Sequence, residues 1–469
     1  MLMRRLFKGS MYVGLMCCLY SCASYNEKIT PYYKEIAAGS YTDAQTALNQ
    51  NKLLQKPRNK LLFYMEKGRT SHLLGAYTES NLYFNLADSL LERGLGGTMD
   101  AAVGTLLNPM NQTYKGEDFE KFMIHYYKAL NYVYLNKPED AIVEARRITI
   151  QTQEQDDKFA NAKNRYAADA FSLMFQGLLY EHDGDVNNAF ISYRNAAELY
   201  LKQPDTTYYG TKLPLVLKQD VIRTAALNGF EDEKQRFERV FNLKAPVAAP
   251  GGELVFFWEN GLAPIKQERD FILARGTNGD FAFTDGNIVV PFYENYYGGN
   301  FNEKSVQSLR VAYPVYVSRS SYFTGATLDN GKDSVQLQQT ENIGVLAFKT
   351  LEQRFAREMA KTLARLAVKK GAETLVSESA KGSGRNGKDD ALLKGIGYGL
   401  QLYNLLSEQA DTRNWQTLPA TISYVRIPLQ NGDNTINLTL SGPNGAREHR
   451  VFHVQGTGKL SFYNYSTLK

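Results

Sequence analysis

The sequence predicts a multidomain α+β protein, in which an N-terminal all-α region of repeated helical hairpins precedes a β-rich, sandwich-like C-terminal region with inserted helices. Two changes of pattern predict this order. Apolar residues recur every three or four positions from about residue 28 to residue 243, as on amphipathic helices. After residue 252 they alternate with a period of two in short runs bounded by Gly or Pro, as in strands. Between the two regions, residues 246–252 (Pro-Val-Ala-Ala-Pro-Gly-Gly) are typical of a linker.

The composition is that of a folded protein and argues against a nucleic-acid partner. Of the 469 residues, 43% are hydrophobic and 22% are charged, and at about 150 residues per domain the length predicts about three domains. The formal net charge is +5, but Arg4, Arg5 and Lys8 supply three of the positive charges near the N-terminus. Because the rest of the chain is almost balanced, we expect no nucleic acid to bind.

Residues 1–21 have the features of a lipoprotein signal peptide. Arg4, Arg5 and Lys8 precede the apolar stretch Met11–Leu19, which is shorter than the roughly 20 residues that span a bilayer. The stretch closes on Leu19-Tyr20-Ser21-Cys22, which resembles a bacterial lipobox. We therefore expect cleavage before Cys22 and attachment of diacylglycerol and a further acyl chain, such as palmitate, which together anchor a protein stably to a membrane.

The cysteines and the first mature residues predict where the protein resides. Cys17, Cys18 and Cys22 are the only cysteines, so the mature chain holds one, at its first residue, and forms no disulfide framework. Ala23 rather than Asp follows Cys22, and no acidic run comes after it. These features predict a lipid-anchored outer-membrane protein that faces the periplasm. An ordinary cleaved signal peptide with an incidental Cys, or an uncleaved anchor, is the alternative.

Residues 22–245 are expected to form helical hairpins. One helical stripe is followed by the break Asn136-Lys137-Pro138 and then by a second stripe. The residues of the first stripe are Phe119, Phe122, Met123, Tyr126, Leu130 and Val133, and those of the second are Ala141, Ala145 and Ile148. This unit resembles a tetratricopeptide repeat (TPR), whose period is about 34 residues. Turn positions 39, 75, 136 and 184 indicate four copies with insertions after the second and third, and a non-repeating helical bundle is the alternative.

Stacked hairpins of this kind form a superhelix with a concave groove. Such a groove is suited to a peptide, an extended segment or a helix of a partner. Tyr126, Tyr132, Tyr180 and Tyr193 are therefore candidate partner-binding residues. Aromatic residues at helical spacing also serve simply as core, and this interpretation remains open for each of the four.

Residues 253–469 are expected to form an antiparallel sandwich of strands with two inserted helices. The helices are expected at about 343–370 and 392–409. The expected strands are Glu253–Trp258, Phe271–Ala274, Phe281–Phe283, Asn287–Val290, Ser308–Val317, Ala420–Ile427, Thr435–Leu440, Arg447–Val454 and Lys459–Tyr465.

Several segments together resemble a known family. They are Tyr114–Glu120, His125–Tyr132, Ala141–Arg147, Asn260–Pro264 and Ala410–Pro419. Their co-occurrence is similar to that in an uncharacterised family of TPR-containing bacterial outer-membrane or periplasmic lipoproteins. The resemblance implies a helical repeat domain, a β-rich C-terminal region and an outer-membrane anchor. It implies no activity, substrate or catalytic residue.

The segment Ala410–Pro419 also predicts a junction between the two regions. Trp415, beside Leu418-Pro419, would anchor the passage from helix to strand in a core, with Asp411 and Arg413 paired or capping. A buried polar network at this domain junction is the alternative interpretation.

The motifs that would indicate catalysis or metal binding are incomplete. Residues 382–388 begin like a phosphate-binding loop, but Asp389 stands where Ser or Thr would ligate magnesium. His449 and His453 share one face of a predicted strand without a third ligand, so we predict no metal site. No thiol remains for catalysis beyond Cys22, and we expect no cofactor other than the covalent lipid.

The sequence therefore predicts a lipid-anchored periplasmic scaffold or adaptor rather than an enzyme. Its helical repeats would bind an envelope protein, with a role in envelope assembly as a further hypothesis. One alternative is a lipoprotein that binds a peptide or a glycan, such as a cell-wall or surface polymer, with tyrosines and Trp258 stacking on sugars. A less favoured alternative is an envelope hydrolase, in which carboxylates would converge with His449 or Arg413.

Overall fold

The computed structural model describes residues 25–95, 109–158, 166–246, 249–275, 281–284, 289–291, 310–354 and 409–469. Residues 1–24, which include the predicted signal peptide and Cys22, lie outside the described residues, as do residues 355–408, which hold most of the two predicted inserted helices. Residues 343–354 are helical, as predicted for the start of the first inserted helix.

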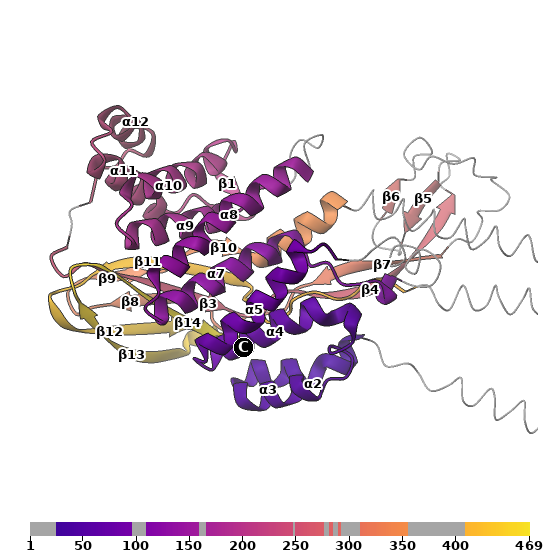
Figure 1. Ribbon diagram of the computed structural model, residues 1–469. Coiled ribbons are helices and arrows are strands. Elements are labelled where there is room, and N and C mark those ends of the chain that lie inside the picture. Colours follow the sequence, from indigo (N-terminus) through magenta and orange to yellow (C-terminus); the bar gives the residue numbers. More distant parts are fainter. Residues whose placement is uncertain are drawn as a thin grey trace, which may run out of the picture.

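The N-terminal half consists of helical hairpins, which confirms the predicted repeats (Figure 1). Five hairpins are described: α2 (Tyr25–Ala38) with α3 (Tyr41–Gln50), α4 (Lys60–Leu73) with α5 (Tyr77–Glu92), α7 (Asp118–Tyr134) with α8 (Pro138–Lys158), α9 (Ala170–His182) with α10 (Val186–Leu201), and α11 (Leu215–Leu227) with α12 (Glu231–Phe241). Short 3-10 helices η1 (Pro57–Asn59) and η2 (Pro109–Asn111) precede α4 and α7, and the ribbon β1 (Thr207–Tyr208) and β2 (Thr211–Lys212) links α10 to α11.

The hairpin turns are set by residues with positive φ. These residues are Gly39, Gly75, Asn136, Gly184 and Gly229, and the first four are the predicted turn positions. A left-handed residue ends a helix because it turns the chain and lets the last carbonyls be capped, and Gly or Asn adopts this conformation at least cost. The fifth turn adds a hairpin that the four predicted copies did not include.

Apart from the ribbon β1–β2, the strands of the described residues form three four-stranded sheets. The first sheet has the order β10 (Gln338–Asn342), β11 (Thr421–Pro428), β3 (Glu253–Asn260), β14 (Leu460–Thr467). The second has the order β13 (Arg447–Gly456), β12 (Gly432–Ser441), β8 (Gly325–Asp329), β9 (Ser334–Gln336), with η4 (Pro443–Gly445) between β12 and β13. The third has the order β6 (Val289–Pro291), β5 (Phe281–Thr284), β4 (Ile265–Arg275), β7 (Arg310–Val317).

Two features of the sheets differ from the expected sandwich. The first sheet is mixed rather than antiparallel, because β14 pairs with β3 in parallel register, from Leu460 beside Glu253 to Thr467 beside Asn260. The chain crosses from the second sheet to the first after β13, and this crossing sets the direction of β14. Strands β8, β9 and β10 were not predicted.

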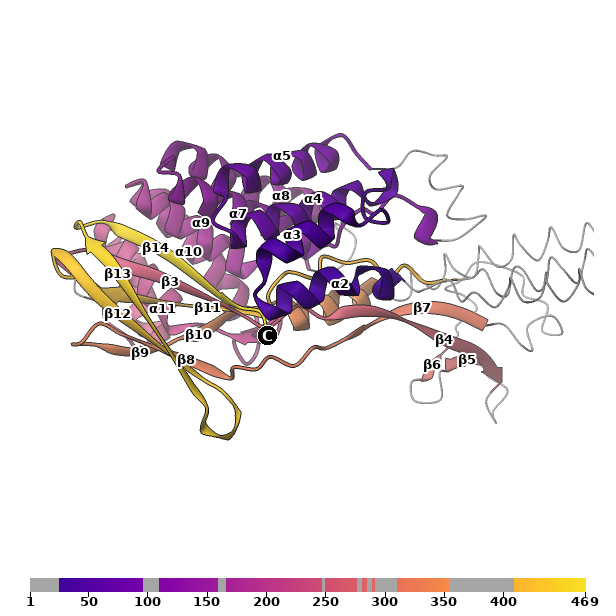
Figure 2. The same cartoon turned by 90° about the horizontal axis from the view of Figure 1, so that it is seen from below.

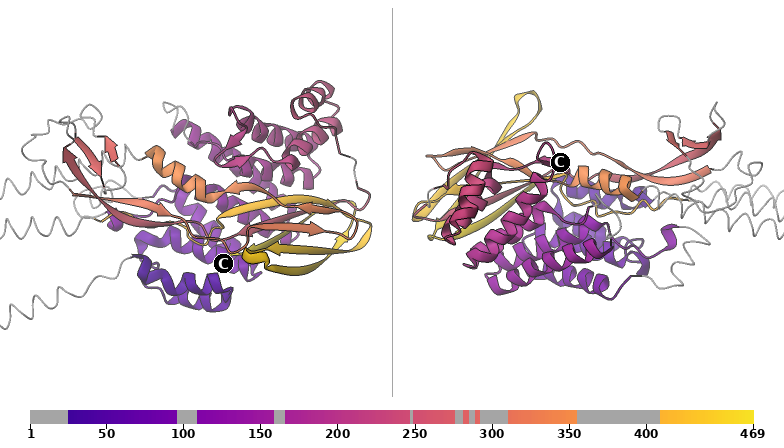
Figure 3. Two further views of the ribbon diagram at one scale, coloured as in Figure 1. Left: turned by 180° about the vertical axis from the view of Figure 1, so that it is seen from behind. Right: turned by 90° about the horizontal axis from the view of Figure 1, so that it is seen from above.

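The helices, the first sheet and the second sheet form three successive layers (Figures 1 and 2). Strand β3 shows why, because its side chains alternate between two cores. Val255 and Phe257 belong to the core shared with the helices, whereas Phe256 and Trp258 belong to the core between the two sheets. A strand covered on both faces reads as a continuous apolar run. The third sheet extends away from these layers at the opposite end of the molecule from β12 and β13 (Figures 2 and 3).

Candidate functional site

In the last four hairpins the first helix faces the first sheet, and the second helix lies on the far side. We call α4, α7, α9 and α11 the inner helices and α5, α8, α10 and α12 the outer helices. Side chains of each inner helix bond to the sheet or to residues 410–419, which we call the strap. The chain itself therefore covers the inner face of the helical stack.

Glu66 of α4 is one anchor of the strap. Its carboxylate is fully buried and accepts hydrogen bonds from the backbone N–H of Gln416 at 3.0 Å and from the hydroxyl of Thr417 at 2.5 Å. Tyr33 and Tyr32 donate to the same carboxylate, at 2.5 and 3.1 Å. Burial raises the pKa of Glu66 above its ordinary value, although the bonds from Thr417 and Tyr33 oppose this shift.

Glu120 of α7 is the second anchor. Its fully buried carboxylate accepts the backbone N–H of Trp415 at 2.7 Å and the hydroxyl of Tyr114 at 2.6 Å. Burial and the charge of Glu117 raise the pKa of Glu120 to about 7. Glu117 itself is held by Lys266 and Arg354, which outweigh its burial and lower its pKa to about 2. Two neighbouring carboxyls thus have different affinities for protons because only one has cationic partners.

Arg413 fixes the beginning of the strap. Its guanidinium is fully buried, and it donates to Asp411 through Nε at 2.8 Å and through Nη2 at 2.6 Å. It also donates to Asn59 Oδ1 at 2.8 Å and to the carbonyl of Gln112 at 2.9 Å. Trp415 is fully buried as well, against Phe84. Arg413 and Trp415 therefore lie buried between the helices and the strands, and Asp411, whose side chain is 32% exposed, pairs with Arg413 at the edge of this polar network.

Two ion-pair groups join the inner helices to the first sheet. Arg69 of α4 meets Glu259 of β3 at 2.5 Å, with both side chains completely buried. Burial would raise the pKa of Glu259, but the charge of Arg69 keeps it below its ordinary value. Farther along, Arg426 of β11 contacts Glu181 of α9 at 2.5 Å and Asp220 of α11 at 2.9 Å. These ion pairs favour one relative position of the helices and the sheet, because breaking either pair leaves a buried charge without a partner.

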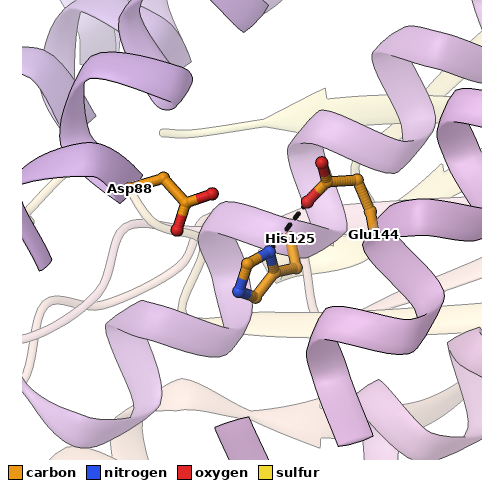
Figure 4. Close-up of side chains that lie close together, drawn as sticks. All are labelled: Asp88, His125 and Glu144. Carbon is orange, nitrogen blue, oxygen red and sulfur yellow. Dashed lines mark hydrogen bonds and ion pairs between the residues drawn. The ribbon is translucent and has the colours of Figure 1, made fainter. Parts of the chain in front are cut away.

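Asp88, His125 and Glu144 form the one cluster, among the described residues, with the spacing of a metal site (Figure 4). Their ligand atoms lie within 4.8 Å of one another, and His125 Nδ1 lies 2.8 Å from Glu144. Lys128 Nζ, however, lies 2.7 Å from Asp88 and 2.9 Å from Glu144, and Arg147 also pairs with Asp88. The lysine ammonium stands where a metal ion would be held, so the geometry describes an internally neutralised cluster that links α5, α7 and α8.

A cavity of about 1040 Å³ lies between the outer helices α8 and α10. We call it the outer groove. Leu173, Gln176 and Tyr180 of α9 form its buried floor. Its walls include Ile150 and Gln153 of α8 and Asn195 and Leu199 of α10. Another cavity, of about 470 Å³, lies on the other side of α8 and shares Arg146 and Ile150 with the outer groove.

The four tyrosines predicted to bind a partner lie in different environments. Tyr126 and Tyr193 are completely buried and donate to Glu259 and Glu181. Tyr132 is half-buried against the helical core, and Tyr180 lines the outer groove. Only Tyr180 of the four thus borders a described cavity.

The residues expected to stack on a glycan or to catalyse hydrolysis are not brought together. Trp258 is 4% exposed and donates to Thr467, so its ring is not presented to a sugar. Arg413 is buried under the helices, whereas His449 is exposed on β13. His449 and His453 share a face of one strand, but four residues of strand separate them by about 13 Å, too far for one metal ion.

No helix in the described part of the chain combines the length and the apolar character that a membrane crossing requires. No family model and no curated protein matches the sequence. The chain is similar to a solved tetratricopeptide repeat protein from Parabacteroides merdae, with 16% identity and a TM-score of 0.30 over 46% of this chain. That match spans 64% of the length of the other protein.

It is also similar to two structures of nearly identical TPR-like repeats from a putative kinesin light chain of Podosopora anserina. Both are 13% identical, with TM-scores of 0.31 and 0.30 over 46% and 45% of this chain and 91% and 90% of theirs. At these scores the likeness establishes nothing about function, and the fold described above rests on this chain's own contacts.

The residues that sequence reasoning missed are the buried carboxylates of the helical stack. Glu66, Glu120 and Glu259 read as ordinary charged positions, because a single sequence does not show which helix face meets the sheet. A signal for the covered face was present in β3, where residues 254–258 are five consecutive apolar residues.

Proposed function

We propose that this protein is a lipid-anchored scaffold of the outer membrane, facing the periplasm, which binds a partner protein through its outer helices. A stack of helical hairpins is consistent with a protein-interaction scaffold. The observation that carries the proposal is the filling of the inner face by the first sheet and the strap. The inner side keeps a cavity of about 540 Å³ between α9, α11, the linker and the first sheet. The larger cavity lies between the outer helices α8 and α10, with another on the other side of α8, so we assign the partner surface to the outer helices.

The anchor is proposed from the sequence of residues 1–22. The basic residues, the short apolar stretch and Cys22 support lipidation, and two acyl chains suffice for stable attachment. A role in envelope assembly would follow from this location. Cys22→Ser is expected to move the mature protein from the membrane fraction to the soluble fraction. Unchanged fractionation would contradict the lipid anchor.

The partner surface is tested by photo-crosslinking in intact cells. A photoreactive residue at Ile150, which is 55% exposed on α8, is expected to yield a discrete adduct with a partner. Val451 on β13 is 56% exposed and provides the matched control, from which no such adduct is expected. Equal labelling from both positions, or none from position 150, would contradict the assignment of the outer helices.

A further inference from the structure

The outer groove has the length of a short extended peptide. Helices α8 and α10 both pack against α9, and the three helices line the groove together, with residues of α9 as its floor. The residues that line the groove on the α10 wall run from Asn188 to Lys202, a length of about 21 Å at 1.5 Å per residue. An extended chain rises about 3.3 Å per residue, so the groove accommodates about seven residues.

The floor of the groove offers unused polar atoms among apolar side chains. Gln176 is 3% exposed, and its Nε2 donates to the carbonyl of Ala145 and to Thr149. Its Oε1 accepts no hydrogen bond from the described residues, and the hydroxyl of Tyr180, which is 9% exposed, has no partner there either. Neither atom is one of the fully enclosed polar atoms that lack a partner, so both open onto the groove, where a ligand's donors and acceptors can reach them.

The walls combine amide and aliphatic side chains. Gln153 and Asn195 face the groove across its floor, and an amide side chain carries both a donor and an acceptor, as a peptide group does. Ile150, Ile191 and Leu199 stand between them and provide apolar surface. Such walls can form hydrogen bonds with the backbone of a bound polypeptide and can bury its apolar side chains.

The ends of the groove differ in charge. The bond from Gln176 to Thr149 and the close contact of Gly177 with Tyr193 fix the order of the three helices. On α8, Arg146 and Asp156 are the first and the last residues that line the groove, and Lys202, directly after α10, is the last lining residue on the opposite wall. None of the three forms an ion pair with the described residues, so Arg146 is available to an acidic group at one end of a ligand.

We propose that the outer groove binds an extended polypeptide segment of about seven residues with apolar side chains, supplied by the partner. This inference rests on the proposed scaffold function and names the partner's chemistry. A helix bonds its own backbone groups internally, whereas an extended backbone presents free N–H and C=O groups to Gln176 and Tyr180. A glycan strand has no apolar side chains for the aliphatic walls.

The test selects a phage-displayed library of random heptapeptides on the full mature protein held in detergent. Peptides with several apolar residues are expected to be enriched and to bind saturably. Asn195→Trp, which fills the groove from an exposed position, is expected to weaken their binding at least about tenfold, or about 1.4 kcal/mol. Asn187→Trp, exposed on the same helix but outside the groove, is the matched control and is expected to leave binding unchanged. Tyr180→Phe keeps the ring and is expected to weaken binding by removing the hydroxyl.

Three results would overturn the inference. In the first, the selection enriches no peptide. In the second, the enriched peptides bind the Asn195→Trp variant as tightly as the unsubstituted protein. In the third, no peptide is enriched, but the protein is retained on purified peptidoglycan and Asn195→Trp abolishes that retention. The last result would assign the groove to the cell-wall polymer rather than to a partner's polypeptide segment. If adducts from Ile150 persist in cells in any of these cases, the scaffold function stands and only the groove assignment falls. If those adducts are absent as well, both fall.

Discussion

The buried pair Arg69–Glu259 gives the sharpest test of how the helices are joined to the first sheet. Replacing Arg69 with Met leaves the Glu259 carboxylate in a site where both side chains are 0% exposed. Removing one partner of a buried ion pair costs about 3–5 kcal/mol. The neutral donors Ser466 at 2.5 Å and Tyr126 at 3.2 Å remain, whereas the contact of Arg69 with the Tyr127 ring is lost. We expect Arg69→Met to lower the free energy of unfolding by about 4 kcal/mol at pH 7.

The assay is urea unfolding followed by the fluorescence of Trp258 and Trp415, the two tryptophans of the chain. The pH dependence supplies a second criterion. In the unsubstituted protein the pKa of Glu259 is held below its ordinary value, so its stabilisation is present above that value and is lost as the pH falls. In the variant, burial without Arg69 raises this pKa, and protonation relieves the penalty at low pH. The cost of Arg69→Met must therefore shrink between pH 7 and pH 5.

The double variant Arg69→Met with Glu259→Gln is the control, because it removes both charges from the interface. It is expected to recover most of the lost stability. A cost below about 1 kcal/mol for Arg69→Met, or a cost that is the same at pH 5 and pH 7, would refute the buried pair as a determinant of the interface.

Three further predictions concern the strap, the hairpin packing and the charged cluster. Burial and the charge of Glu117 raise the pKa of Glu120 to about 7. The contribution of Glu120 to stability is therefore full below its ordinary pKa of 4.5 and is lost as the pH rises through 7. Glu120→Gln should flatten the fall in unfolding free energy between pH 5 and pH 8 in urea titrations, and an unchanged slope would disprove this. Gly177→Ala places a Cβ 2.5 Å from the Tyr193 ring and should cost about 1–3 kcal/mol in the same assay, whereas Gly325→Ala, with open space around it, should be nearly neutral; equal effects would count against tight hairpin packing. Lys128→Met removes the cation held by Asp88 and Glu144. Zinc chloride should therefore raise the melting temperature of this variant and not that of the unsubstituted protein. An equal response of both proteins would show that Lys128 does not occupy the cation position.

The helical half was predictable because its signals are local. The helical stripes and the residues with positive φ, such as Gly39 and Asn136, lie within single hairpins, so the turns could be placed from the sequence. The strands with alternating apolar residues, such as β11 and β12, were located on the same principle.

The remaining features depend on contacts between distant residues. Strands β8–β10 escaped prediction because Gly325–Asp329, Ser334–Gln336 and Gln338–Asn342 are short and carry few apolar residues. The strap bonds Glu66 and Glu120 across about 300 residues or more of chain, and no local pattern reports such a partner. The sequence predicted a concave groove that holds another protein. In the structure the chain's own first sheet and strap cover that face of the helical stack.

The filling of the inner face is tested most directly by hydrogen exchange at the backbone amides of Trp415 and Gln416. Each donates to a buried carboxylate, of Glu120 and of Glu66. If the strap is a permanent part of the core, both amides exchange only through global unfolding, as slowly as the most protected amides of β3. Exchange of the two amides that is orders of magnitude faster than in β3 would show that the strap opens locally and would contradict a permanently covered inner face.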